Sequence, residues 1–141
     1  FCINPIAIND QVKTVGELEI LHFLDDEYKT GEGLLIDART PSWHSKGTIP
    51  GSVNIPFTIF GESHNNPELK SAMAQLGVSK TSSGWNFKNA KKLMLWCNGS
   101  WCGQSPRAIR NLIDLGYPAK KLHWYRGGMQ NWNTLGLTMV K

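Results

Sequence analysis

Short apolar runs alternate with amphipathic segments along this chain. The runs are bounded by glycine, proline or polar turn residues, as is typical of buried strands, and they lie at residues 33–38, 53–56, 92–96 and 121–125. Apolar residues recur at helical spacing in the segments around them, which predicts helices at 14–31, 67–76, 106–115 and 129–135. This alternation predicts an α/β fold with a central, mostly parallel sheet and helices on both faces.

The first helical segment carries the clearest start signal. Residues 14–17 (TVGE) predict a capping box at its beginning, and Gly31 marks its end. Its predicted apolar face consists of Leu18, Ile20, Leu21 and Leu24. Residues 40–43 predict a short helical turn, and the polar residues 79–90 predict a surface loop. No linker or repeat divides the sequence, so residues 1–141 are expected to form a single domain.

Composition and charge narrow the class of protein. At 141 residues the chain has the length of one domain, and its 40% hydrophobic and 18% charged residues are typical of globular proteins. The formal net charge is +4, but the basic residues are dispersed rather than gathered in a stripe with interleaved aromatics. We therefore expect no nucleic-acid partner, while the positive charge suits a small anionic substrate.

Cysteine and histidine usage argues against a disulfide framework and against a metal site. The three cysteines are Cys2, Cys97 and Cys102, and the four histidines are scattered without ligand spacing. Neither a metal nor another cofactor is expected. No apolar run approaches the roughly 20 residues that span a bilayer, so no membrane span is predicted. The compartment stays open, although an apolar start without methionine favours an exported over a cytoplasmic protein.

The strongest candidate for chemistry is Cys97, which follows the apolar run 92–96. A polar loop with two glycines comes next, and Ser105 with Pro106 predicts the N-cap and first position of a helix. This arrangement presents the sulfur at the carboxyl end of a buried strand, facing the positive end of a helix, where a thiolate is stabilised. The alternative is that Cys97 is a small buried apolar residue without chemistry.

Three further stretches are similar to motifs of the single-domain rhodanese family. Residues 35–41 are LIDARTP and resemble the family's D-x-R-x-P segment at a strand end. Residues 47–56 are GTIPGSVNIP and resemble its G-H-I-P-G-A-x-N-I-P signature. Residues 125–132 are YRGGMQNW and, with LGL at 135–137, resemble its C-terminal G-G-x-x-x-W followed by G-L-P. The likeness runs from about residue 12 to the end, which leaves 1–11 as an N-terminal extension.

The resemblance implies a rhodanese-like domain with a five-stranded sheet and a sulfurtransferase activity. Cys97 then stands at the position of the family's active cysteine and would carry sulfane sulfur as a persulfide. The donor would be a small anion such as thiosulfate, and the acceptor cyanide, a thiol or a protein. Asp37 and Arg39 would support the active loop. The substrate-binding loop would comprise Asn98, Gly99, Ser100, Trp101, Cys102, Gly103, Gln104 and Ser105.

The chain also departs from the family pattern, mainly in this loop. Seven residues, 98–104, separate Cys97 from Ser105, where the family typically has five. Gln104 replaces an arginine that is common before the serine, and Cys102 is an additional cysteine within the loop. Thr48 stands where histidine is usual, and Ser42 where glutamate is common. These differences concern substrate preference more than fold.

The proposed chemistry requires a lowered pKa at Cys97. A cysteine with a pKa of about 8.5 is only ~3% thiolate at pH 7, whereas a pKa of about 6.5 would make it about 75% thiolate. Such a shift needs close to 2.7 kcal/mol, while one helix end supplies about 0.3–1 kcal/mol. Several backbone N–H groups around the sulfur are therefore expected, with Gly99 and Gly103 permitting positive φ or close backbone approach.

The other loop and aromatic residues have open or structural interpretations. Cys102 is either a resolving thiol that attacks an oxidised or persulfidated Cys97, or a loop residue without chemistry. Trp101 is expected to form a wall of the pocket. Packing roles are predicted for Trp43, Trp124 and Trp132.

Three alternatives to a sulfurtransferase remain. A phosphatase or arsenate reductase of similar loop design needs an arginine six residues after the cysteine, and that position is Gly103. A thiol–disulfide redox protein could use Cys97 and Cys102, although their spacing is not C-x-x-C. A catalytically inactive rhodanese-like binding module would keep the fold without the reaction.

Overall fold

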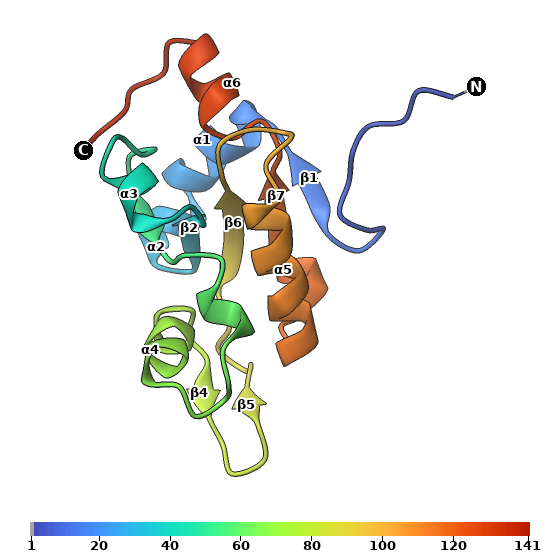
Figure 1. The fold of residues 1–141 in the computed structure, drawn as a ribbon, viewed down its shortest axis with the longest axis vertical. Helices are drawn as coiled ribbons and strands as arrows, with labels where there is room; N and C mark the ends of the chain where they lie inside the picture. Colours follow the sequence, from blue (N-terminus) through green and yellow to red (C-terminus); the bar gives the residue numbers. More distant parts are fainter. Residues whose placement is uncertain (1) are drawn as a thin grey trace.

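Five parallel strands form the central sheet of the computed structural model, which describes residues 2–141 (Figure 1). The strands are β1 (Lys13–Val15), β2 (Gly33–Asp37), β3 (Ser52–Asn54), β6 (Lys92–Trp96) and β7 (Leu122–Tyr125). They follow the order β1-β7-β6-β2-β3 across the sheet, and every neighbouring pair is parallel. The expected α/β architecture is confirmed, with a sheet that is parallel throughout. Phe1, the first residue of the expected domain, lies outside the described residues.

Helices cover both faces of this sheet, as predicted. The helices are α1 (Glu17–Asp25), α2 (Glu27–Thr30), α3 (Pro41–His44), α4 (Pro67–Gln75), α5 (Gln104–Leu115) and α6 (Gly128–Thr134), with single 3₁₀ turns at η1 (Ile59–Gly61) and η2 (Ala119–Lys121). The apolar core residues of α4 and α5 belong to one hydrophobic cluster, and those of α1 and α6 belong to the other. Strand β6 contributes to both, because Leu93 and Leu95 face the first cluster and Met94 and Trp96 the second. Burial on both faces explains why the strand is a continuous apolar run.

The N-terminal part of the fold differs from the prediction. Lys13–Val15 form β1, paired with β7, instead of opening a helix, so the capping box predicted at residues 14–17 is wrong. The N-cap is Gly16, whose N–H donates to the Glu19 carboxylate at 3.0 Å. The helical segment is also interrupted at Asp26, where φ is −118° and ψ is −94°.

The predicted apolar face of α1 is confirmed for Ile20 and for Leu24, which packs partly buried against the same cluster, but it is wrong for the other two residues. Ile20 and Phe23 are buried, whereas Leu18 and Leu21 are exposed. The prediction followed the helical spacing of the leucine and isoleucine residues and did not include Phe23. In the structure Phe23 packs closely against Gly33, which leaves no room for a side chain at that glycine.

Two other segments contain structure that the polar pattern did not indicate. The predicted loop at 79–90 contains a short antiparallel hairpin, β4 (Ser79–Lys80) with β5 (Trp85–Asn86). Near the C-terminus, Thr48 and Val140 form an isolated antiparallel bridge with N–H···O distances of 2.8 and 3.0 Å. The bridge brings Met139 against Gly47, which follows α3 and directly precedes Thr48.

Candidate functional site

The candidate site lies where β2 and β6 end, beneath the loop that joins β6 to α5 (Figure 1). Cys97 follows β6 directly, and Asp37 is the last residue of the neighbouring β2, paired in register with Trp96. Ligands of open parallel sheets bind at this edge. The sheet therefore brings together Asp37, Arg39 and Cys97, the residues that the sequence placed in the site.

The first half of the loop is fixed to the start of α6. The backbone N–H groups of Met129 and Gln130 donate to the carbonyls of Cys97 and Asn98, each at 3.0 Å. These N–H groups belong to the first turn of the helix and would otherwise lack partners. Gly128 makes the approach feasible, because its φ is +57° and a Cβ there would lie 2.2 Å from the Cys97 carbonyl oxygen.

The second half of the loop is a tight turn that leads into α5. The Cys102 N–H donates to the Gly99 carbonyl at 3.0 Å, and α5 begins at Gln104 with Gly103 as its N-cap. The predicted N-cap role of Ser105 is therefore wrong. Positive φ was also not needed at either glycine, but Gly99 does allow a close approach, since a Cβ there would overlap the Trp101 ring.

Ser105 has a different role, because its side chain turns inward to the cysteine. Its Oγ lies 3.0 Å from Cys97 Sγ, and its N–H donates to the same sulfur at 3.3 Å. The indole N–H of Trp124 donates to this Oγ at 3.0 Å, so the hydroxyl hydrogen is free to point at the sulfur. Two donors from one residue thus face Sγ.

Cys97 is more enclosed than the sequence suggested. The residue is 1% exposed, and within residues 2–141 the one backbone N–H that hydrogen-bonds to Sγ is that of Ser105. The pKa of Cys97 is raised, because its thiol donates a hydrogen bond to the Cys102 side chain and because burial disfavours the thiolate, with the two Ser105 donors opposing both effects. The prediction of an amide cradle that lowers the pKa of Cys97 is wrong for this conformation.

The backbone N–H groups of the loop favour the thiolate of Cys102 instead. Its pKa is lowered to about 6, chiefly because the Cys97 thiol donates to it, with further contributions from the backbone N–H groups of Gln104 and Asn98 and from the charge of Arg39. Partial burial opposes the shift. Cys102 is half-buried, so its sulfur is the more accessible of the pair. The loop therefore holds one thiolate and one thiol near neutral pH.

Alkylation of Cys102 by iodoacetamide is expected to follow a titration with its midpoint near pH 6. The reason is that the thiolate is the reactive form of cysteine. The measurement is the modified fraction of the Cys102 peptide by mass spectrometry at a series of pH values. In guanidinium chloride the midpoint should move to about pH 8.5, the ordinary cysteine value. Equal midpoints in the folded and unfolded protein would contradict the assignment.

Asp37 and Arg39 lie beneath the loop as a buried ion pair. The guanidinium donates to both carboxylate oxygens, from Nε at 2.9 Å and from Nη2 at 2.8 Å. Arg39 also donates to the Gly47 carbonyl at 2.7 Å and to the side chain of Asn98 at 3.3 Å. The pair therefore links the end of β2 to the loop that follows Cys97.

Two partners of Asp37 were not predicted from the sequence. Thr48 donates to the carboxylate at 3.0 Å, and His44 Nδ1 lies 2.9 Å from the same oxygen. Threonine thus supplies a hydrogen bond to Asp37 from the position where the family usually has histidine. The signal available in the sequence was the spacing of the 47–56 motif, which places Thr48 close to the end of β2.

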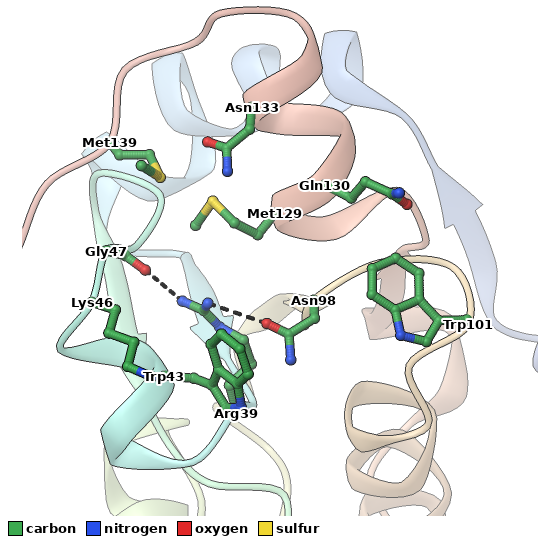
Figure 2. A pocket seen from close by; sticks show the side chains of 10 residues that line it. All are labelled: Arg39, Trp43, Lys46, Gly47, Asn98, Trp101, Met129, Gln130, Asn133 and Met139. Carbon is green, nitrogen blue, oxygen red and sulfur yellow. Dashed lines mark hydrogen bonds between the residues drawn. The ribbon is translucent and has the colours of Figure 1, made fainter.

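A pocket of about 430 Å³ opens beside the loop (Figure 2). Trp101 forms one wall, as predicted, and Trp43 with Lys46 forms another. The Lys46 ammonium lies 4.7 Å from the centre of the Trp43 ring. The packing role predicted for Trp43 is therefore wrong, because its side chain is 46% exposed and faces this pocket. The remaining lining residues are Arg39, Gly47, Asn98, Met129, Gln130, Asn133 and Met139.

The chemistry of the lining suits an anionic ligand with an apolar part. Among the described residues that line the pocket there is no aspartate or glutamate, whereas Lys46 and Arg39 are cationic. Two methionines and two tryptophans supply apolar surface. In residues 2–141 no group of three or more histidine, cysteine, aspartate or glutamate side chains is placed to hold a metal ion. Over the same residues, no helix has both the length and the apolar character needed to cross a bilayer.

Comparison with known proteins gives the site its family context. The chain is 28% identical over 109 residues to the HTH-type transcriptional regulator Rv0324 of Mycobacterium tuberculosis; the match covers 77% of this chain but only 38% of that protein. The fold is similar to that of the human single-domain sulfurtransferase TSTD1, with a TM-score of 0.58, 21% identity and coverage of 87% and 96% of the two chains. It is also similar to the As/Sb reductase of Leishmania major, with a TM-score of 0.59, 19% identity and coverage of 89% and 79%.

The likeness to the two solved structures shows the fold alone, because enzymes with different reactions share it. The match to a family model shows more than the fold, because it assigns the chain to a family. The model of the rhodanese-like domain matches residues 21–135, a span that includes Asp37, the whole 97–105 loop and the turn at Gly128. The chain belongs to the rhodanese-like domain family.

Proposed function

We propose that this protein is a sulfurtransferase that carries sulfane sulfur on its active loop as a persulfide of Cys97. The donor is a small anionic sulfane compound such as thiosulfate, and the acceptor is cyanide or a thiol, including the thiol of a protein. The loop follows β6, and the Asp37–Arg39 ion pair beneath it lies at the end of the neighbouring β2, so both belong to the one sheet.

The observation that carries the proposal is the pair of Ser105 donors at Cys97 Sγ. The N–H at 3.3 Å and the Oγ at 3.0 Å lie where negative charge develops on the sulfur. Donors fixed in this way stabilise an anion at no cost of reorganisation. Trp124 holds the Oγ in place, and the first turn of α5 adds its positive end.

The proton of Cys97 has a defined acceptor. Its thiol donates to the Cys102 side chain, whose lowered pKa keeps that sulfur ionised near neutrality. Ionisation of Cys97 therefore passes its proton to Cys102, which is exposed enough to release it to water. Since Cys97 is 1% exposed, attack on a donor also requires the Gly99–Cys102 turn to move aside.

The transfer is a double displacement at sulfur. The Cys97 thiolate attacks the outer sulfur of thiosulfate, a new S–S bond forms, and sulfite leaves with the electron pair of the broken bond. An acceptor nucleophile then attacks the outer sulfur of the persulfide, and the Cys97 thiolate is the leaving group. The anion or the acceptor binds in the pocket beside Asn98 and Trp101, where Lys46 supplies positive charge and the tryptophan and methionine side chains supply apolar surface.

Loading with thiosulfate tests the proposal. Directly after the addition of thiosulfate, the intact mass is expected to increase by one sulfur atom, with no increase in Cys97→Ser and a lasting increase in Cys102→Ser. Cys2→Ser is the matched control, since it removes an exposed thiol outside the loop. A sulfur atom gained by Cys97→Ser to the same extent as by the wild type would overturn the assignment.

A second candidate function is thiol–disulfide exchange, which the contact between Cys97 and Cys102 favours. It predicts a loss of two hydrogens under mild oxidant, dependent on both cysteines and independent of any sulfur donor. A binding module would show neither the gain of sulfur nor this loss.

A further inference from the structure

Cys102 lies where it can reach any sulfur carried by Cys97. Its carbonyl oxygen accepts a hydrogen bond from the Cys97 thiol at 3.5 Å, and the interaction between the two side chains raises the pKa of Cys97 and lowers that of Cys102. We propose that Cys102 resolves the Cys97 persulfide, so that the loop releases the sulfane sulfur as hydrosulfide and closes a Cys97–Cys102 disulfide. This inference rests on the proposed sulfurtransferase function and adds a reductive outcome to it.

The anchoring of the loop confines the required movement to a short turn. The Cys97 and Asn98 carbonyls are held by α6, and Gly103 already caps α5. Between these fixed ends the Gly99–Cys102 turn carries the second cysteine. Four residues separate the two cysteines, so closing the ring involves a small loop and little loss of chain entropy.

Access and charge favour Cys102 over any external thiol as the attacking group. The inner sulfur of the persulfide is Cys97 Sγ, which is buried, so an external thiol meets the outer sulfur first. Cys102 approaches from inside the loop, and its lowered pKa makes it a thiolate near pH 7. A nucleophile held in place reacts with a high effective concentration.

The step balances without an external oxidant. The Cys102 thiolate attacks Cys97 Sγ in Cys97–S–SH, the Cys97–Cys102 S–S bond forms, the bond to the outer sulfur breaks, and HS⁻ leaves with its electron pair and its proton. The sulfane sulfur is reduced to sulfide while the two thiols are oxidised to a disulfide. An external dithiol, or two monothiols, then reduces the disulfide and is itself oxidised. A thiol-reducing reaction must therefore supply this protein with electrons.

A single-turnover experiment in the absence of any added thiol tests the step. The reference protein carries Cys2→Ser, so that only the loop cysteines remain. After addition of thiosulfate it is expected first to gain one sulfur atom, and then to release up to one equivalent of sulfide and end with a mass two hydrogens below that of the untreated protein. Adding Cys102→Ser should preserve the gain of one sulfur and slow sulfide release by at least about tenfold.

The outcomes separate this inference from the proposed function. If the reference protein keeps its added sulfur without forming a disulfide, or if Cys102→Ser releases sulfide at the same rate, Cys102 is not the resolving thiol. The sulfurtransferase proposal then still stands, because the persulfide has formed. If no variant gains sulfur or releases sulfide, the proposed function itself fails. Recovery of the dithiol mass after a dithiol is added shows that the cycle closes.

Discussion

Replacement of Asp37 by alanine is expected to lower the free energy of unfolding by about 3–5 kcal/mol, the usual cost of removing one partner of a buried ion pair. Asp37 is completely buried and Arg39 is 2% exposed, so the guanidinium would be left without its counter-ion and far from water. Thr48 and His44 would also lose their shared acceptor. Equilibrium unfolding in urea measures the change.

The same substitution should also disorder the loop. Asp37 fixes the position of the Arg39 guanidinium, and Arg39 in turn donates a hydrogen bond to Asn98 in the loop. Sulfur loading of Asp37→Ala is therefore expected to fall even under conditions where the protein remains folded. The matched control is Asp25→Ala, which removes the carboxylate of an exposed ion pair with Lys29. If both variants lower the free energy of unfolding by a comparable amount, the buried ion pair of Asp37 contributes no more to stability than the exposed pair of Asp25.

Replacement of Gly128 by alanine is expected to reduce the rate of sulfur loading by about 100-fold, as a displacement of about 1 Å in an active site can do. The added Cβ would lie 2.2 Å from the Cys97 carbonyl oxygen and 2.9 Å from the Gly99 nitrogen, so the loop must shift away from α6. The positive φ of +57° costs a further 1–2 kcal/mol or so in stability. Stopped-time mass spectrometry of the loaded protein measures the rate.

A matched variant separates the clash from the backbone strain. Gly136 has a φ of +70°, and no atom lies within 4 Å of where its Cβ would be. Gly136→Ala should therefore lose only the stability that the positive φ costs, about 1–2 kcal/mol, and should load sulfur at the wild-type rate. If the two variants load equally slowly, the close contact between Gly128 and the loop does not control the reaction.

Much of the fold could be predicted because the buried parallel strands leave a strong pattern. Strands β2 and β6 are covered on both faces, so they appear as uninterrupted apolar runs bounded by turn residues. Strand β1 was not predicted, because only Val15 of its three residues is buried and the segment lacks an apolar run. The β4–β5 hairpin escaped it because its four residues are polar or partly exposed.

The site was predictable in position but not in electrostatics. The order of motifs placed Asp37, Arg39 and Cys97 at one edge of the sheet, which the structure shows. Which sulfur is ionised depends on which one the backbone N–H groups favour, and those of Asn98 and Gln104 help to lower the pKa of Cys102. The sequence contains no periodic signal for such directions. Trp43 was misplaced for a related reason, since an aromatic residue on a short helix does not reveal whether it faces the core or a cavity.

The bridge between Thr48 and Val140 has a consequence for substitutions in the pocket. It places Met139 in the wall of the pocket, although that residue lies outside the segment 21–135 common to the family. Residues of this C-terminal tail can therefore be substituted without a change at Cys97, Asp37 or Arg39. A substitution at Met139 would therefore alter the pocket without altering the family segment that contains the loop.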